Sequence, residues 1–523
     1  MNAPLEKKYI YKGAFSLVIA GLISKVISAF YRIPLQNLTG DLGFYIYQQI
    51  YPILGIAFMF ALYGFPAALS KVMAERKADQ YHLALYQKLF FTLMLFCAIA
   101  FILIFNLSPW LAQWMGDVKL ETPIRYSAFV FLCIPFVAIL RGALQAQSEM
   151  QVTAHSQMIE QLIRAAVIIW TAYWIYREKL VHHDIAVGAV AASLSAFTMS
   201  FLYLYVQWKK RLTIERQPVK LDVWFLIRSV ILPGLIISMN HMLLLFMQLA
   251  DAFTIVPGLH AKGMPLKEAM KWKGVFDRGQ PLLQLVTIVG SSFALALIPQ
   301  ATKIQWQTNR QETLEKVRSL NKYCFILSVG AVAGLVILFP EINQLLFKNS
   351  LGSNSLRILS ISLLFSSLVL TIASILQGIG YIKWTALVLV IGLLVKLILN
   401  SFLVPWLGIS GSAMATTVAI FIIYLLNVYQ LKKVMKGERV FQIPWRAISL
   451  STIMMTIGLI IIKYINTILR LETRIELFFL VMVSVLIGFT LYLLGLFWFK
   501  AFTKAEIENI PILHKLQKSK RWL

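Results

Sequence analysis

The sequence predicts an all-α, polytopic membrane protein with about fourteen transmembrane helices. The first observation is compositional: of 523 residues, 59% are hydrophobic and only 14% are charged, and the mean hydropathy is +0.74. A soluble domain does not need that much apolar surface. The second observation is that apolar runs of roughly 20 residues, the length that crosses a bilayer, recur along nearly the whole chain.

Each expected helix is an apolar run bounded by a polar break. In order, the runs cover 15–33, 45–69, 89–104, 128–144, 165–176, 185–208, 223–250, 281–298, 324–340, 358–376, 384–404, 411–431, 447–465 and 475–499. The fifth run is short because charged residues enter its first turns. No short apolar stretch with a small-residue cleavage site opens the chain, so we expect the first helix to be retained.

Basic residues predict the orientation of these helices. Every second connection is rich in Lys and Arg, as in 209–220, 303–322 and 432–439, and the tail at 515–521 is basic as well. Since cytoplasmic loops carry the excess of Lys and Arg, both termini are predicted to be cytoplasmic. The lysines of 262–273 fall on the outside against this rule. The net charge of +26 is dispersed over loops, which indicates contact with membrane lipids and no nucleic acid partner.

Several chemistries have no supporting motif. Cys97, Cys133 and Cys324 lie in or beside apolar runs, at spacings that fit neither a disulfide framework nor a zinc site. The sequence holds no GxxxxGK[ST] phosphate loop and no His/Glu cluster with metal-ligand spacing. We therefore expect no enzyme, no cofactor and no metal site.

The chain contains an internal repeat. The segment VGAVAASLSAFTMSFLYLYVQWKK, starting at Val187, aligns without a gap with SGSAMATTVAIFIIYLLNVYQLKK, starting at Ser410. A chance match of apolar helices explains Leu and Ile pairs, but it does not explain the coincidence of Gly188 with Gly411 and of the two Lys-Lys pairs. The repeat predicts two parallel six-helix halves, an architecture typical of transporters. The halves are 1–215 and 216–440, and 441–523 adds two further helices and a basic cytoplasmic tail.

Charged residues within the apolar runs are the candidate functional residues, because each would cost at least about 2.5 kcal/mol if it faced lipid. Lys25 lies near the middle of the first helix, and Arg32 follows seven residues later on the same face. The other candidates are the i,i+4 pair Glu160 and Arg164, the pair Lys396 and Asn400, Asp251 at the end of the seventh helix, and Asp277 with Arg278 at the start of the eighth.

Simpler roles compete with ligand binding for some of these residues. Arg32 is close enough to a helix end for its side chain to reach the interface, and Glu160 with Arg164 could be a structural ion pair. Lys25 and Lys396 lie too deep in the membrane for their side chains to reach the interface, and neither has an acidic residue on the same turn. We therefore expect them to line a cavity.

A cavity built from all the candidates would carry a positive excess. Five cations, Lys25, Arg32, Arg164, Arg278 and Lys396, stand against Glu160, Asp251 and Asp277. The ligand is therefore predicted to be an anion. Phosphate is favoured because it takes several charged donors at once and arginine binds it with two parallel hydrogen bonds.

A series of motifs carries a resemblance over nearly the whole chain. They are SKVISAFYRIP, GDLGFYIYQQIYP, YGFPAALSKVMAE, LRGALQAQSEM, SQMIEQLIRA, DRGQPLLQL and KLILNSFLVPWLGISGSAMATT, in that order. The chain resembles the polysaccharide-transporter branch of the multidrug/oligosaccharidyl-lipid/polysaccharide flippase superfamily. More narrowly, it is similar to the stage V sporulation protein B group and its MurJ-like lipid II flippase relatives of endospore-forming bacteria.

The resemblance implies roles for particular residues. In the family, basic residues line a central cavity that takes a lipid pyrophosphate, and Arg32 and Arg278 fall on such positions. Lys25 does too, where the family usually has Arg. Lys396 and Asn400 match the helix in which MurJ relatives have sodium ligands, and an ammonium there would itself occupy the cation position.

The resemblance implies a flippase that moves an undecaprenyl-pyrophosphate-linked saccharide, lipid II-like, from the inner to the outer leaflet of a bacterial cell membrane. Coupling to the membrane potential, to H+ or to Na+ stays open, and cell-wall synthesis enzymes are potential partners. Two alternatives stay open as well. One is a multidrug exporter of the same fold, and the other is a non-transporting scaffold for cell-wall or spore-envelope assembly.

Overall fold

The computed structural model describes residues 3–75, 81–179, 183–211, 214–215, 223–285, 287, 310–469 and 473–502. Within these ranges nearly every element is a helix. The exception is a pair of two-residue parallel strands, β1 (Tyr81–His82) and β2 (Ile214–Glu215), which join a connection of the N-terminal half to the connection between the two halves. The all-α class predicted from composition is confirmed.

The N-terminal half begins with a helix that doubles back on itself. α1 (Ala3–Met59) contains a break at Gly40, where φ is 68° and ψ is −175°. Glycine adopts this left-handed φ without a Cβ clash, so one arm crosses the bundle and the other returns. The helices that follow are η1 (Phe60–Gly64), α2 (Phe65–Glu75), α3 (Leu83–Trp114), η2 (Val118–Leu120), α4 (Glu121–Ser127), α5 (Phe129–Ala146), α6 (Met150–Glu178) and α7 (Asp184–Arg211).

The C-terminal half begins with a helix that is divided into short segments, and a further pair of helices follows it. Its helices are α8 (Val223–Leu226), η3 (Ile227–Ile231), α9 (Leu232–Asn240), α10 (Leu243–Ala261), α11 (Leu266–Asp277), α14 (Arg310–Phe347), α15 (Ser353–Ile379), α16 (Ile382–Leu407) and α17 (Ile409–Val434). The appended pair is α18 (Trp445–Leu469) and α19 (Arg474–Trp498). Most of the expected span 281–298 lies outside the described residues.

Among the described residues, 12 helices are long and apolar enough to cross a membrane. The first of them, Ile19–Ala74, contains both runs expected at 15–33 and 45–69, and the expected run 223–250 is divided between Trp224–Asn240 and Leu243–Ala261. The fifth helix is the clearest departure, because α6 extends 15 residues further toward its N-terminus than the apolar run. Its first turns carry polar side chains that are buried inside the protein, including Ser156, Gln157 and Glu160.

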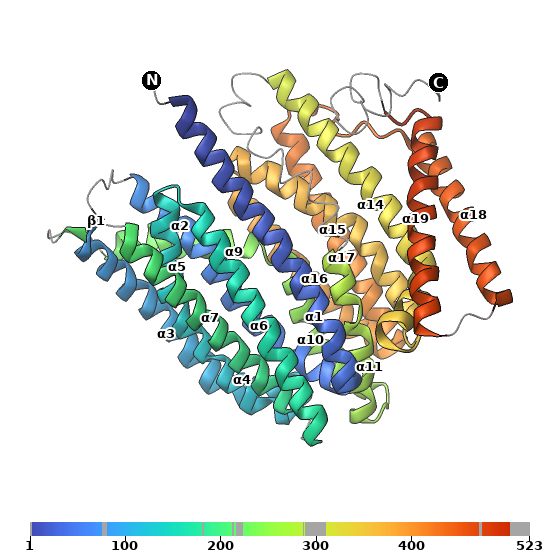
Figure 1. Cartoon of the computed structure of the whole chain (residues 1–523), viewed down its shortest axis with the longest axis horizontal. Helices are drawn as coiled ribbons and strands as arrows, with labels where there is room; N and C mark the ends of the chain where they lie inside the picture. Colours follow the sequence, from blue (N-terminus) through green and yellow to red (C-terminus); the bar gives the residue numbers. More distant parts are fainter. Residues whose placement is uncertain are drawn as a thin grey trace.

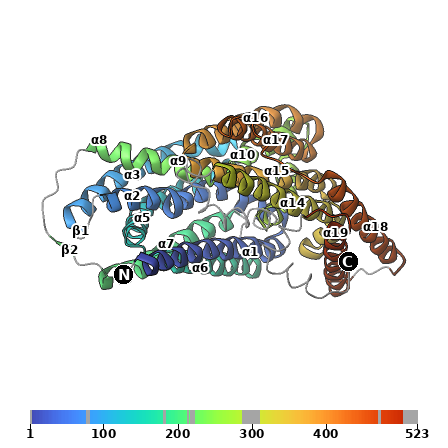
Figure 2. The ribbon, with the colours of Figure 1, turned by 90° about the horizontal axis from the view of Figure 1, so that it is seen from above.

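Figure 1 shows the start of α1 and the end of α19 at the same end of the bundle, with α11 at the opposite end. We call these the termini end and the α11 end. Seen from above in Figure 2, α1, α6 and α7 lie on one side and α10, α15, α16 and α17 on the other, while α18 and α19 form an outer edge. Large apolar side chains cover the periphery, as at Phe91, Phe402 and Phe479, which fits a surface facing lipid chains.

Equivalent helix pairs pack alike in the two halves. A Cβ at Gly188 of α7 would overlap the Thr171 side chain of α6, and a Cβ at Gly411 of α17 would overlap the Leu403 carbonyl of α16. These are the two glycines that the sequence repeat aligns. The same close approach, at the same place in each helix pair, supports the parallel repeat.

The two halves also meet backbone to backbone near the termini end. A Cβ at Gly64 would overlap the Gly234 carbonyl and the Ser238 hydroxyl of α9, and the Ser238 hydroxyl donates to the Met59 carbonyl at 3.3 Å. We call this contact the glycine seam. It joins the end of η1 in the first half to α9 in the second.

Candidate functional site

In the N-terminal half, Glu160 is the centre of a buried ionic network. Its Oε2 atom accepts from Arg141 Nη2 at 2.7 Å, and its Oε1 atom accepts from Arg164 Nη2 at 2.9 Å. Arg141 also donates to the Ser156 and Ser200 hydroxyls and to the Ala61 carbonyl, each at 3.1 Å. These bonds connect α5, α6, α7 and η1, so the network holds the half together.

Arg164 is only partly used by this network. Its Nε atom is buried without a hydrogen-bond partner, and its guanidinium carbon lies 3.0 Å from the centre of the Phe58 ring. The ion pair with Glu160 that the i,i+4 spacing suggested is present. Arg141, which the sequence patterns did not single out, makes four hydrogen bonds in this network, whereas Arg164 makes one.

In the C-terminal half, Lys396 and Asp251 form the corresponding buried pair. Lys396 Nζ donates to Asp251 Oδ2 at 2.6 Å and to the Met247 carbonyl at 2.9 Å, and both side chains are at most 1% exposed. Asp251 Oδ1 also accepts from Asn400 Nδ2 at 3.1 Å and from the Ser412 hydroxyl at 2.7 Å. The ammonium therefore occupies an oxygen-lined position between α10, α16 and α17.

At the α11 end, Arg278 pairs with Asp41. Three hydrogen bonds of 2.6 to 2.9 Å join the guanidinium to the Asp41 carboxylate, and a fourth joins it to Asn349 Oδ1 at 2.6 Å. Gln36 Nε2 also donates to Asp41 at 2.8 Å. Asp277, next to Arg278 in sequence, pairs instead with Lys273 of its own helix at 2.6 Å.

Asp277 ends α11, which is not one of the candidate membrane spans. Burial raises the pKa of its carboxyl to about 6, and the Lys273 ammonium opposes that rise. Desolvation disfavours the charged carboxylate more than the ammonium stabilises it. This acid therefore titrates closer to neutral pH than an exposed aspartate.

Arg32 has no acidic partner among the described residues. Its side chain is 1% exposed, its Nη2 donates to the Ser28 hydroxyl at a long 3.4 Å, and its Nε is buried without a partner. The guanidinium lies over the Tyr51 ring at 4.2 Å. An arginine that only reached for the membrane interface would be exposed, so the burial argues against that role.

Lys25 also lacks a hydrogen-bonding or acidic partner within the described ranges, and its side chain is partly accessible. It lies within electrostatic range of His241, at the break between α9 and α10. His241 in turn stacks on Tyr63, with ring centres 4.2 Å apart. Lys25 is therefore on the side of α1 that faces the C-terminal half.

Lys25, Arg32, Arg164 and Gln157 form what we call the α1–α6 face. The two helices pack along each other (Figure 1). A Cβ at Gly21, one turn before Lys25, would lie 3.8 Å from Gln157 Nε2. Further along, Tyr31, Tyr47 and Tyr51 lie within electrostatic range of both Arg32 and Arg164. Buried polar atoms without partners gather here, namely Ser24 Oγ, Arg32 Nε, Gln157 Oε1 and Arg164 Nε.

The structure thus divides the predicted site residues into two classes. Arg164, Arg278 and Lys396 each form an ion pair with a buried carboxylate, whereas Lys25 and Arg32 do not in the chain as described. Two uncompensated cations on one face of a membrane helix fit an anionic ligand. The described residues hold no cluster of three or more His, Cys, Asp or Glu side chains that could bind a metal ion.

Sequence comparison finds relatives over most of the chain. An uncharacterized Bacillus subtilis membrane protein, YabM, is 37% identical over 433 residues, covering 82% of this chain and 81% of its own. The Bacillus subtilis lipid II flippase MurJ is 24% identical, covering 81% and 82% of the two chains. Stage V sporulation protein B from the same organism is 24% identical, covering 82% and 85%.

Solved structures show the same fold. A lipid II flippase MurJ in an inward closed conformation superposes with a TM-score of 0.67 at 14% identity, covering 92% of this chain and 97% of that one. The MATE multidrug transporter DinF-BH gives a TM-score of 0.56 at 20% identity, covering 81% and 95%.

The model of the family described as polysaccharide biosynthesis protein matches residues 10–305, which is more than half of the chain. Together with the 37% identical relative and the shared fold, this match shows that the chain belongs to the polysaccharide biosynthesis protein family and has the fold of the MOP superfamily of flippases and multidrug transporters.

Proposed function

We propose that the protein is a flippase that moves a lipid-linked saccharide pyrophosphate, of the undecaprenyl, lipid II-like kind, from the inner to the outer leaflet of the cell membrane. The observation that carries this proposal is the pair Lys25 and Arg32, two inward cations without an acidic partner among the described residues. Arg164 adds a third, partly used guanidinium to the same face.

The chemistry of the α1–α6 face suits a pyrophosphate. Lys25 and Arg32 are separated by seven residues, or about 10 Å along the helix, a distance that neighbouring phosphate oxygens and an adjoining sugar can span. Charge-assisted hydrogen bonds from Arg32 Nε and Arg164 Nε would satisfy donors that are buried without partners. The prenyl chain would stay in lipid, because only the headgroup needs a polar path.

The Asp41–Arg278 pair has a role in this mechanism. It closes the α11 end by joining the corner of α1 to the start of the eighth span. With both termini in the cytoplasm, as we propose from the basic loops, the α11 end faces outward and the pair must open for the headgroup to leave. An inside-negative potential assists the outward movement of an anion by about 2.3 kcal/mol per charge per 100 mV.

We propose that transport does not require a sodium ion bound in the C-terminal half. The ammonium of Lys396 lies where a bound monovalent cation would neutralise Asp251, and it is attached to the chain. The membrane potential, or protons, would then drive transport.

A multidrug exporter of cationic compounds is the second candidate, and it has less support. Such substrates need an accessible carboxylate, yet Asp41, Glu160 and Asp251 each form an ion pair with a lysine or arginine of the chain. A scaffold without transport activity would leave the uncompensated charges on α1 unexplained.

The deciding experiment is reconstitution of the full chain in liposomes that contain a fluorescent undecaprenyl-pyrophosphate saccharide, with the fraction in each leaflet measured by a membrane-impermeant quencher. We expect flipping by the wild type and loss of flipping in Arg32→Ala at matched abundance. Arg125→Ala is the matched control, because Arg125 is an arginine paired with Glu121 and 39% exposed. An inactive wild type, or an active Arg32→Ala, would refute the proposal.

A further inference from the structure

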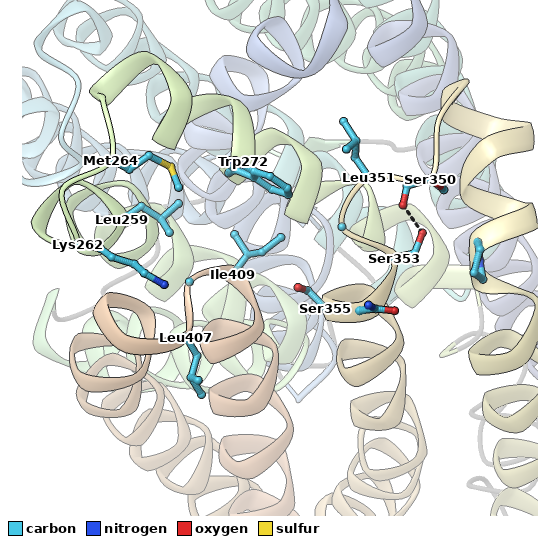
Figure 3. A pocket seen from close by; sticks show the side chains of 14 residues that line it. Leu259, Lys262, Met264, Trp272, Ser350, Leu351, Ser353, Ser355, Leu407 and Ile409 are labelled. Atoms are coloured by element: carbon cyan, nitrogen blue, oxygen red, sulfur yellow. Dashed lines mark hydrogen bonds between the residues drawn. The ribbon is translucent and has the colours of Figure 1, made fainter.

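A pocket of about 600 Å³ lies at the α11 end, where three connections of the C-terminal half meet (Figure 3). Its wall comes from the end of α10 with α11, from the connection between α14 and α15, and from the connection between α16 and α17. The volume is within the range of small-molecule sites. The pocket shares no residue with the α1–α6 face.

The wall combines an aromatic ring, hydroxyl groups and one cation. Figure 3 shows Trp272 with Lys262 and Met264 on one side and Ser350, Ser353 and Ser355 across from them. Lys262 Nζ donates one hydrogen bond to the Trp406 carbonyl at 3.1 Å, and its ammonium has two further N–H groups that can donate. No Asp or Glu is among the residues that line the pocket.

This combination fits a saccharide that carries an anionic group. The C–H face of a pyranose ring can pack on the indole of Trp272, while its hydroxyls can hydrogen-bond the exposed Ser350 hydroxyl. The Ser353 and Ser355 hydroxyls already bond Ser350, Asn343 and Ser410, and they fix the shape of this side of the wall. Lys262, without a carboxylate nearby in the wall, favours a phosphate or carboxylate substituent over a neutral sugar and disfavours a cation. We propose that this pocket is a second binding site, for the anionic saccharide portion of a ligand at the α11 end.

The pocket shares a loop with the ion pair that closes this end. Asn349 accepts a hydrogen bond from Arg278 through the same Oδ1 atom that accepts from the Leu351 backbone N–H at 3.1 Å. Leu351 lines the pocket, and its carbonyl accepts from Asn343 at 2.8 Å. A ligand that moves this loop would therefore move a partner of Arg278. On the proposed function, on which this assignment rests, the pocket is a waiting position for the headgroup on its way out.

The test is equilibrium binding to the purified full chain in nanodiscs, with N-acetylglucosamine 1-phosphate as the probe and N-acetylglucosamine and inorganic phosphate as comparisons. We expect saturable binding in which the sugar phosphate is tightest. Trp272→Ala should weaken it about tenfold, and Trp272→Phe should retain most of it, because the apolar plane remains. Lys262→Gln should reduce the sugar phosphate to the level of the neutral sugar.

Trp114→Ala is the control, since Trp114 is an exposed tryptophan that ends α3, outside the pocket. The proposal is overturned if no saturable binding occurs, if Trp272→Ala binds like wild type, or if inorganic phosphate binds as tightly as the sugar phosphate. Arg32→Ala separates this proposal from the proposed function. Probe binding that survives Arg32→Ala but not Trp272→Ala assigns the ligand to the pocket, whatever the flipping assay gives. Probe binding that survives Trp272→Ala but not Arg32→Ala assigns the ligand to the α1–α6 face and refutes binding in the pocket.

Discussion

The guanidinium of Arg278 holds the carboxylate of Asp41, a residue 237 positions earlier, through three hydrogen bonds of 2.6 to 2.9 Å. Asp41 follows directly after the break at Gly40, where the first helix turns back. One ion pair thus ties the corner of the N-terminal half to the C-terminal half at the α11 end.

Neutralising both partners should loosen this end. In the double variant Asp41→Asn/Arg278→Gln, we expect a cysteine introduced at Ser28 to react faster with a membrane-impermeant reagent added from the outside. The measurement needs a background in which Cys97, Cys133 and Cys324 are replaced. An unchanged rate would show that the pair does not control access, and Arg125→Gln in the same background reports any general loosening.

Replacing Glu160 should lower the stability of the protein, mainly because the buried Arg141 then loses its carboxylate partner. Glu160→Gln leaves two buried guanidinium groups without a carboxylate, and breaking a buried pair typically costs about 3–5 kcal/mol. We therefore expect lower abundance and a lower Tm in detergent. Adding Arg141→Gln should restore more stability than adding Arg164→Gln, since Arg141 is completely buried. Equal rescue by the two, or normal stability with lost transport, would contradict this order.

The effect on flipping of substituting Lys25 or Arg32 should depend on whether the charge and the planar guanidinium group are kept. Lys25→Arg keeps the charge and should be tolerated, whereas Arg32→Lys loses the planar fork and should be partly defective. Alanine at either position should reduce flipping about tenfold or more, since one charge-assisted hydrogen bond contributes about 1.5–3 kcal/mol. Flipping rates are compared at matched abundance. Full activity in Arg32→Gln would show that the charge is not there for the substrate.

Wild-type transport should not depend on sodium, because Lys396 already neutralises Asp251. Replacing Na+ by N-methylglucamine should leave the initial flipping rate unchanged. Lys396→Met removes the ammonium but keeps Asp251, the Met247 carbonyl and Asn400, so any remaining transport should become sodium-responsive. A sodium-dependent wild type would refute this assignment.

Asp277 gives the stability of the protein a predictable pH dependence. Its pKa is raised by burial from 3.8 to about 6 in the folded chain, so between these values the folded state binds the proton more readily than the unfolded chain. Stability from this group is therefore greatest below pH 3.8 and declines as the pH rises toward about 6. The difference in Tm between wild type and Asp277→Asn should change across that window and be constant above it. A constant difference throughout would contradict the raised pKa.

Apolar length and charge spacing were enough to predict the helical class and the ion pair of Glu160 with Arg164. They could not identify Asp41 or Arg141 as partners. Asp41 stands between two apolar runs and resembles a loop residue, and its partner is 237 positions away. Arg141 sits at the end of an apolar run, where a basic residue is ordinarily topogenic. Only the packing of α5 on α6 and α7 shows that it points inward.

The lysines at 262–273 depart from the pattern of cytoplasmic basic loops for a similar reason. A segment with alternating charge and apolar residues does not register as a membrane span, and Leu266–Asp277 forms α11, a short helix outside the candidate spans. Lys273 is buried against Asp277, so it is not a loop charge available to set the orientation. Hydropathy has no means of distinguishing a paired lysine from a solvated one.

The glycine seam has a consequence for the electrical integrity of the membrane. At Gly64 and Gly234 the two halves approach so closely that not even a methyl group fits between them. A hydrated ion is far larger than a methyl group and cannot pass at that contact. On the proposed function, the protein changes shape repeatedly across an energised membrane, and this backbone-to-backbone contact would keep ions from leaking between the halves and dissipating the membrane potential.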